Sequence, residues 1–330
     1  MPSAVLAKSP RTPRPPAAEF RSALLEWYDV HKRDLPWRQD RNPYRVWLSE
    51  IMLQQTRVAA VLEHYRKFLE RFPNVQTLAA ARESTVLAAW SGLGYYRRAR
   101  MLHAAARVVM RQHKGTFPGS SEEWQNLPGI GRYTAAAVAS IAFNEPVAVV
   151  DGNVARVLSR LYGRNLESRE SWEAAANLLA LRRPGDFNQA MMELGATVCV
   201  PRQPLCLSCP VFSLCASQGD SPRPRRKPAQ TKRQIDYALH CRNGSVFLCR
   251  RPGDASLMPG MWELPEIANP EAASKVLLTL RHSITVTDYI VRVRQCVPQR
   301  SQGRWVTSSR ARGLPLTGLA RKILRVAGII

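Results

Sequence analysis

The sequence predicts a two-domain chain, with an all-α domain over residues 19–215 followed by a smaller α+β domain over residues 234–330. Apolar residues recur at helical spacing through the first part, whereas apolar and polar residues alternate in the second. Between the two, residues 216–233 are basic, rich in proline and free of large apolar side chains, which is typical of a linker. Residues 1–18 are also basic and Pro-rich, so we expect a disordered arm there.

Helical periodicity identifies the elements of the first domain. In AEFRSALLEWYDVHK, residues Phe20, Leu24 and Tyr28 share one face. PYRVWLSEIMLQQT repeats the helical spacing with Tyr44, Trp47, Leu48 and Ile51. The stretches YYRRARMLHAAARVVMRQH and SWEAAANLLALRR are helical by the same criterion. Strand signals are scarce in this part of the chain, so we expect it to be all-α.

The second domain begins with a hairpin pattern. In YALHCRNGSVFLCRR, two apolar runs flank Asn243-Gly244, a dipeptide that favours the tight turn of a β-hairpin. The stretch YIVRVRQC alternates as a strand does, and ARKILRVAG predicts a closing helix. We expect Cys241, Cys249 and Cys296, which are scattered along this domain, to be core residues.

The chain of 330 residues is strongly basic. Its 48 Lys and Arg outnumber 25 Asp and Glu, which gives a net charge of +23. This surplus indicates a polyanionic partner, with nucleic acid the usual one, although a charged soluble surface without a partner is the alternative. The linker either follows a phosphate backbone or is simply solvated. No apolar run approaches the ~20 residues of a membrane span, and the N-terminus has no signal-peptide pattern.

The stretch Leu127-Pro128-Gly129-Ile130-Gly131 predicts a turn between two helices, one ending near Gln125 and the next starting near Arg132. Glycines can adopt positive φ and let a ligand approach the backbone. The N–H groups at the start of the second helix, together with its dipole, can then bind a phosphate without reading sequence. An ordinary corner between two helices is the alternative interpretation.

Four cysteines are closely spaced in the pattern Cys199-x6-Cys206-x2-Cys209-x5-Cys215. The total of seven cysteines is odd, which favours reduced thiols or metal binding in a cytoplasmic, reducing compartment. Zinc sites prefer two tight C-x2–4-C pairs, and only one pair here is that tight. An iron–sulfur cluster tolerates uneven spacing, and this spacing resembles the [4Fe-4S] loop of endonuclease III and its relatives. Zinc and disulfides remain the alternatives.

Two carboxylates have contrasting expected surroundings. Glu50 lies on a mostly apolar helix face, where lost hydration would keep it protonated near neutral pH and available as a general acid. Pairing on the helix surface with Arg57 or another basic residue is the alternative. Asp151 follows the apolar run PVAVV and opens a helix, where N–H groups keep a carboxylate ionised; simple capping is the commoner role. One neutral and one ionised carboxyl is the division that glycosidic bond cleavage requires.

Six motifs cover about residues 35–215: LPWRQDRNPYRVWLSEIMLQQTRV, GLGYYRRARMLH, LPGIGRYTAAAV, VDGNVARVLSR, MMELGATVC and the cysteine loop. Together, and in this order, they resemble the helix-hairpin-helix DNA glycosylases, and in particular the MutY-type adenine DNA glycosylases. The resemblance implies that Glu50 protonates adenine at N7, that Asp151 stabilises the sugar cation, and that Asn153 helps to hold it. The base would first be flipped out of the duplex.

The resemblance also implies the DNA contacts. Gln55 and Thr56 would border the opening opposite the flipped base, Tyr95 would wedge beside the guanine lesion, and Arg38 would lie near the adenine pocket. Bifunctional relatives carry a lysine where this chain has Tyr133, and that amine forms a Schiff base that leads to strand cleavage. A phenol cannot do so, hence we expect a monofunctional glycosylase in which Tyr133 contacts the nucleotide and orients Asp151.

In this family the last hundred residues form a Nudix-like domain that recognises 8-oxoguanine. VFLCRRPGDASLMPGMWELPEI and GLPLTGLARKIL resemble its beginning and end, but the acidic Mg²⁺-binding helix has no counterpart. The family's lesion-sensing loop usually reads Phe-Ser-His; here it reads Ile284-Thr285-Val286, so only the Thr285 hydroxyl remains to bond the lesion. A plain strand start is the alternative for Thr285, since Thr is common in strands.

The resemblance therefore implies a monomeric repair enzyme that acts on double-stranded DNA containing 8-oxoG:A or G:A pairs. Other interpretations are a glycosylase of different specificity on the same scaffold, such as one for mismatched thymine or oxidised pyrimidines, and a non-enzymatic DNA-binding iron–sulfur protein. The pair Glu50 and Asp151 argues against the latter, because two carboxylates weaken phosphate binding. A nucleotide pyrophosphatase is excluded by the missing acidic helix.

Overall fold

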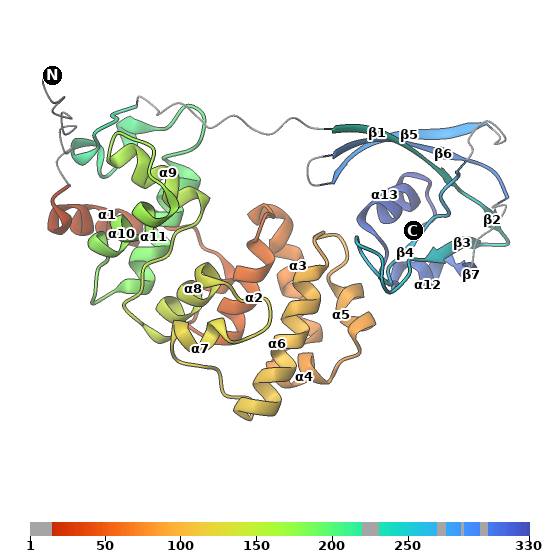
Figure 1. The fold of residues 1–330 in the computed structure, drawn as a ribbon, viewed down its shortest axis with the longest axis horizontal. Coiled ribbons are helices and arrows are strands. Elements are labelled where there is room, and N and C mark those ends of the chain that lie inside the picture. Colours follow the sequence, from red (N-terminus) through yellow and green to blue (C-terminus); the bar gives the residue numbers. More distant parts are fainter. Residues whose placement is uncertain (1–14, 220–230, 269–274, 285–286, 298–302) are drawn as a thin grey trace, which may run out of the picture. The chain divides into compact units, whose positions relative to one another are not determined.

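The computed structural model describes residues 15–219, 231–268, 275–284, 287–297 and 303–330. The chain forms two compact units that interleave in sequence (Figure 1). The first contains Met1–Glu50 and Phe117–Arg225, and the second contains Ile51–Thr116 and Arg226–Ile330. Each unit is therefore built from two separate stretches of chain.

The first unit is helical. Its elements are α1 (Ala17–His31), η1 (Pro36–Arg38), most of α2 (Pro43–Leu53), α7 (Ser121–Gln125), α8 (Arg132–Phe143), α9 (Gly152–Leu161), α10 (Ser168–Leu178), α11 (Pro184–Thr197), η2 (Cys206–Ser208) and η3 (Phe212–Leu214). The expected stripe on α1 is confirmed, because Phe20, Leu24 and Tyr28 are all buried, with Phe20 edge-on to Phe187 of α11. These contacts hold α11 beside α1.

Glycines on α11 allow it to pack tightly against two neighbours. A Cβ at Gly195 would lie 2.7 Å from Cβ of Asn153 on α9, and one at Gly185 would lie 2.5 Å from the Ser140 carbonyl oxygen on α8. Any larger residue would push these helices apart. The close packing places the last turns of α11 next to the first turn of α9, and Met192 of α11 contacts Tyr133 in the first turn of α8.

The second unit begins with four helices: α3 (Val58–Arg71), α4 (Val75–Ala80), α5 (Glu83–Ala89) and α6 (Arg97–His113). Apolar side chains at intervals of three and four residues, Val61, Tyr65 and Phe68, bury one face of α3. Trp90, at the end of α5, lies edge-on to Phe68. These contacts fix the turn after α5, which leads into α6.

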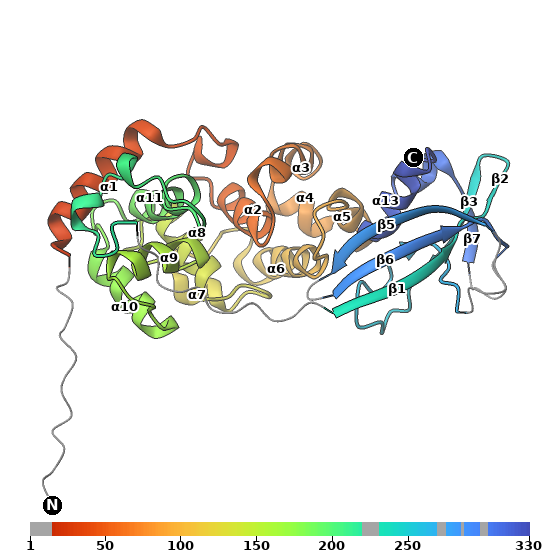
Figure 2. The same ribbon diagram turned by 90° about the horizontal axis from the view of Figure 1, so that it is seen from above.

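The rest of the second unit contains two sheets and two helices. The strands are β1 (Thr231–Ala238), β2 (Cys241–Arg242), β3 (Ser245–Arg250), β4 (Trp262–Glu263), β5 (Val276–Ile284), β6 (Thr287–Arg294) and β7 (Gly303–Thr307), and the helices are α12 (Ser308–Arg312) and α13 (Gly318–Val326). In the sheet β1-β6-β5, β1 runs parallel to β6 and β5 antiparallel to it (Figure 2). In the other sheet, β3 pairs with β2, β4 and β7. Buried Val246, Val291 and Ile323 help to form one core here.

The structure confirms the helical region, the later α+β region, the hairpin at Asn243-Gly244, the strand at YIVRVRQC and the closing helix. Asn243 and Gly244 both have positive φ, as the tight turn requires. Strand β1 starts at Thr231, inside the predicted linker, because Thr231 pairs with Thr287. The prediction that all three scattered cysteines lie in the core was wrong, since Cys241 is exposed on a two-residue strand. No helix within the described ranges is long and apolar enough to cross a membrane.

Candidate active site

Glu50 and Tyr133 form the centre of the candidate site. Glu50, near the end of α2, is only 6% exposed, and Tyr133, in the first turn of α8, donates its hydroxyl hydrogen to Glu50 Oε2 over 2.8 Å. Burial raises the pKa of Glu50 to about 7; the Tyr133 hydrogen bond opposes this, the charge of Asp151 adds to it, and Arg38 opposes it. The expected apolar setting of Glu50 is therefore present, and surface pairing with Arg57 is not.

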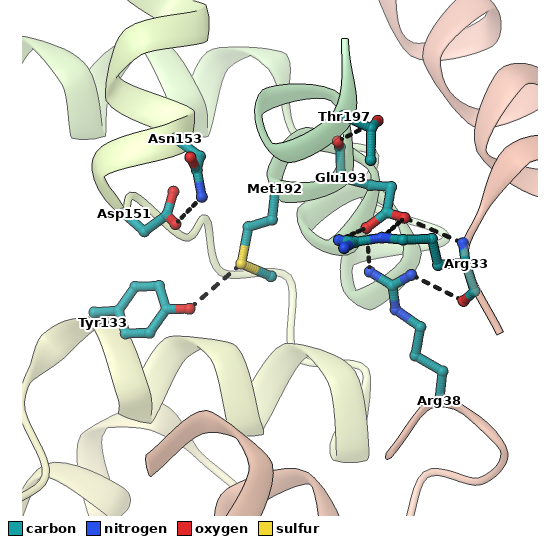
Figure 3. A network of polar contacts seen from close by, with 8 residues as sticks. All are labelled: Arg33, Arg38, Tyr133, Asp151, Asn153, Met192, Glu193 and Thr197. Atoms are coloured by element: carbon teal, nitrogen blue, oxygen red, sulfur yellow. Dashed lines mark hydrogen bonds and ion pairs between the residues drawn. The ribbon is translucent and has the colours of Figure 1, made fainter. Parts of the chain in front are cut away.

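Tyr133, expected to orient Asp151, contacts Glu50 instead. Its hydroxyl also lies 3.3 Å from Sδ of Met192 on α11 (Figure 3). Since a phenol has one hydrogen, it can donate to only one of the two at a time. Burial raises the pKa of Tyr133 well above its usual value, with the nearby Glu50 and Asp151 charges adding to the shift, so the hydroxyl stays protonated.

Asp151 caps the N-terminus of α9, as expected. Its Oδ1 accepts the Val154 N–H over 2.7 Å and its Oδ2 accepts from Asn153 Nδ2 over 3.0 Å. Arg156 fixes the orientation of the Asn153 amide by donating to its Oδ1 over 2.8 Å. Arg156 also donates to the Cys199 carbonyl over 2.9 Å. A chain of hydrogen bonds thus joins Asp151 to the start of the cysteine loop.

Glu193 of α11 is a site residue that sequence reasoning missed. It is 1% exposed and accepts hydrogen bonds from Arg33 at 2.6 Å and from Arg38 at 2.8 Å (Figure 3). Burial alone would raise the pKa of Glu193, but the bonds from Arg33 and Arg38 outweigh burial and lower it to about 2. The available signal was a glutamate inside the apolar stretch MMELGA. This ion pair also explains the position of the Arg38 guanidinium, which lies between Glu193 and the ring of Tyr28.

The predicted hairpin lies between α7 and α8. Gly129 has a φ of +76°, whereas Gly131 has a φ of −93°, so only the first glycine uses the left-handed region. Leu127 and Ile130 are buried, while Gly131 is exposed and begins α8 without a side-chain cap. A helix that begins without a side-chain cap, as α8 does at Gly131, can bind an anion at its positive end. Pro128 completes the turn, in which the Ile130 N–H donates to the Leu127 carbonyl.

Gln55, Thr56 and Tyr95 lie in the second unit, on two turns that Arg98 joins. Gln55 and Tyr95 both have positive φ, and Tyr95 is 48% exposed. The Arg98 guanidinium donates to the Ile51 and Met52 carbonyls, to the Thr56 hydroxyl, and to the Leu93 and Gly94 carbonyls, over 2.8–3.3 Å. These bonds bring the three predicted DNA-contacting residues into one substructure. Thr285 and Val286 lie outside the described residues.

The four cysteines of the loop line a single cavity next to α9. Arg160 donates to Cys199 Sγ over 3.3 Å, and Cys215 Sγ donates to the Arg160 carbonyl over 3.4 Å. Within the described part of the chain, no three His, Cys, Asp or Glu side chains are arranged to hold a single metal ion. In a [4Fe-4S] cluster each thiolate binds a different iron, so four cysteines around one cavity fit a cluster better than one zinc ion.

Comparisons with known proteins agree with this geometry. Residues 48–180 match the HhH-GPD superfamily of base excision DNA repair proteins. A solved structure described as a thermostable thymine-DNA glycosylase has 33% sequence identity and a TM-score of 0.58, covering 61% of this chain and 96% of that one. The match supports the helix-hairpin-helix glycosylase fold of the helical region.

Curated relatives named adenine DNA glycosylase match more of the chain. The mouse protein (Mus musculus) is 41% identical over an alignment of 312 residues, and the match covers 75% of this chain and 60% of that protein. The chain spans 39% of the human protein and 50% of the Arabidopsis thaliana protein. The protein from Buchnera aphidicola subsp. Acyrthosiphon pisum is 32% identical over an alignment of 266 residues, and the match covers 77% of this chain and 76% of that protein. The chain therefore belongs to the adenine DNA glycosylase family, of the MutY type.

Proposed function

We propose that this protein removes adenine mispaired with 8-oxoguanine or guanine in double-stranded DNA, by hydrolysis of the N-glycosidic bond. The observation that carries this proposal is the buried Glu50, whose pKa near 7 keeps its carboxyl neutral for much of the population at physiological pH. Asp151 lies close enough for its charge to raise that pKa further. Family membership supports adenine as the base, and the net charge of +23 supports DNA as the partner.

In the proposed reaction, Glu50 donates its proton to N7 of the extruded adenine as the bond to deoxyribose stretches. The base then leaves as a neutral molecule. Asp151 stabilises the positive charge that develops on the sugar, and Asn153 holds the Asp151 carboxylate in place. Water then adds to the sugar cation and gives up one proton to the Glu50 carboxylate, which leaves an abasic site and restores the acid. The Glu193–Arg38 ion pair supports the loop that precedes α2, the helix that carries Glu50.

Strand cleavage is not expected, because the group beside Glu50 is the Tyr133 phenol rather than a lysine amine. A hydroxyl cannot form the imine that leads to elimination of the phosphate. The enzyme is therefore proposed to be monofunctional, with Tyr133 serving as a hydrogen-bond donor to the catalytic acid.

The DNA contacts are proposed from the geometry of each unit. The uncapped N-terminus of α8, after Gly131, would bind a backbone phosphate. Exposed Tyr95 would wedge into the duplex, while Gln55 and Thr56 border the space left by the flipped base. A Nudix-like role for the α+β region, with Thr285 at the lesion, rests on the sequence resemblance. The cysteine cavity would hold a [4Fe-4S] cluster that stiffens the loop in a reducing compartment.

One assay tests this function. The protein is incubated with duplexes that carry 8-oxoG:A, G:A, G:T or T:A, and strand breaks are counted with and without hot alkali. We expect alkali-dependent breaks at adenine in the first two duplexes, and little adduct when borohydride is present. Breaks without alkali, or efficient borohydride trapping, would contradict the monofunctional assignment. Preferential cleavage of G:T would favour thymine removal, an activity named for a structural neighbour that is 33% identical.

A further inference from the structure

The turn that carries Tyr95 has an unusual backbone. Gly92 and Gly94 have φ values of +112° and +71°, and Tyr95 itself has a φ of +47°. A left-handed conformation is unfavourable for a residue with a bulky side chain, so surrounding contacts must hold it. Tyr95 points a large apolar ring toward solvent at 48% exposure. The contacts that hold the two ends of this turn therefore determine the position of the Tyr95 ring.

Both ends of the turn bond to the carboxy-terminal part of the same unit. Tyr96, which is 2% exposed, donates its hydroxyl hydrogen to the Leu316 carbonyl over 2.8 Å. At the other end, Arg321 of α13 donates from Nε to the Ser91 hydroxyl over 2.7 Å. The Ser91 and Tyr96 hydroxyl oxygens lie 3.3 Å apart. Both ends of the turn around Tyr95 are thus held by hydrogen bonds with residues more than 200 positions later in the sequence, Leu316 and Arg321.

The Leu316 carbonyl, which accepts the Tyr96 hydrogen bond, is itself held in place. Leu316 is fully buried between α12 and α13, and the next residue, Thr317, donates its N–H to the Trp262 carbonyl over 2.9 Å. The Trp262 N–H in turn donates to the Pro315 carbonyl over 2.9 Å. Arg321 also donates to the Leu314 carbonyl over 3.3 Å. The 314–317 segment is therefore tied to strand β4, so the anchor for Tyr96 belongs to the sheet region.

We propose that Tyr96 and Arg321 are positioning residues that tie the Tyr95 turn to the carboxy-terminal α+β region. Through them, that region controls how firmly Tyr95 is inserted into DNA. This inference rests on the proposed function, in which Tyr95 is the residue that enters the duplex. Neither Tyr96 nor Arg321 need contact DNA or the reacting base.

The test measures affinity and chemistry separately. Affinity is measured with an 8-oxoG:A duplex whose adenosine carries a 2′-fluorine and resists cleavage, and chemistry as the single-turnover rate of adenine release at saturating protein. Tyr96→Phe and Arg321→Gln should each weaken affinity by about 3- to 10-fold, the range for one hydrogen bond. The saturated rate should stay within about twofold of wild type, since the catalytic carboxylates are untouched. Arg325→Gln, which removes the same charge from an exposed position on α13, should leave affinity unchanged.

A double-mutant cycle with Tyr95→Ala shows whether the effect acts through Tyr95. We expect Tyr96→Phe to cause no further loss of affinity once the Tyr95 ring is absent. Unchanged affinity in both single variants, full additivity with Tyr95→Ala, or an equal fall in saturated rate and affinity would each overturn the proposal. If wild-type protein releases no adenine, the proposed function fails, and the affinity cycle still reports whether Tyr96 acts through Tyr95.

Discussion

The hydroxyl of Tyr133 lies 2.8 Å from Oε2 of Glu50, although 83 positions separate the two residues in sequence. When the Tyr133 hydroxyl donates to Oε2, that oxygen is an acceptor, and the carboxyl hydrogen of neutral Glu50 is then on Oε1. That hydrogen is then free to reach a substrate. The contact therefore orients the Glu50 carboxyl and also lowers its pKa.

The rate of base release should depend on pH through Glu50. Burial holds its pKa near 7, so the neutral, proton-donating form is dominant below about pH 7 and declines above it. We predict that the single-turnover rate at saturating protein is level on the acid side and falls about tenfold per pH unit well above the pKa. A rate that stayed level from about pH 6 to 9 would exclude Glu50 as the acid.

Tyr133→Phe should move this pH profile in a defined direction. The Tyr133 hydrogen bond lowers the pKa of Glu50, so its removal raises that pKa and shifts the falling limb to higher pH. The measurement is the same rate profile, compared with that of Tyr28→Phe, which removes a hydroxyl from a ring that faces Arg38 instead. A shift to lower pH, or none, would show that the bond does not tune the acid.

Glu193→Gln should destabilise the protein. The pKa of Glu193 is lowered to about 2, so its charged form contributes stability above pH 4.5, which is lost as pH falls toward 2. Breaking this buried pair should reduce the free energy of unfolding by about 3 kcal/mol at neutral pH. The check is urea denaturation of both proteins at pH 7 and near pH 3, where the difference should shrink.

Asp29→Asn is the matched control for this change. Asp29 pairs with Arg183 at 2.6 Å, but their side chains are 44% and 41% exposed. Solvent-exposed pairs contribute less than about 1 kcal/mol, so this variant should unfold close to wild type. Equal losses in the two variants would mean that burial of Glu193 does not decide its contribution.

Cys206→Ser should remove one ligand of the proposed cluster. We expect purified wild-type protein to contain about four iron and four sulfide per chain, with visible absorbance, and the variant to lose much of each. Cys241→Ser changes an exposed cysteine outside the loop and should keep full iron content. Wild-type protein that binds one zinc ion instead of iron would contradict the cluster.

Much of the site follows from local sequence. Helical periodicity, the PGIG turn and the apolar run before Asp151 were sufficient to predict α1, α8 and the cap of α9, because these depend on neighbours within a few residues. The hairpin at Asn243-Gly244 was predicted for the same reason, since its backbone conformation is set by the two residues themselves.

The remaining features depend on contacts between distant segments. The partner of Tyr133 is Glu50 rather than Asp151, because α2 passes beside the first turn of α8. Glu193 and Arg33 are 160 positions apart, and only the packing of α11 brings them together. Cys241 was expected in the core, but the strand that carries it has just two residues and leaves its side chain exposed. Local patterns carry no information on such pairings.

The most direct test of the central claim is the Glu50→Gln variant, assayed for binding and for base release on the same 8-oxoG:A duplex. Gln keeps the size of the side chain but cannot donate an acidic proton. The account predicts duplex affinity within about threefold of wild type and a single-turnover rate lowered by about 10²- to 10⁴-fold, the range for a general acid. Adenine release at close to the wild-type rate, with affinity retained, would contradict it.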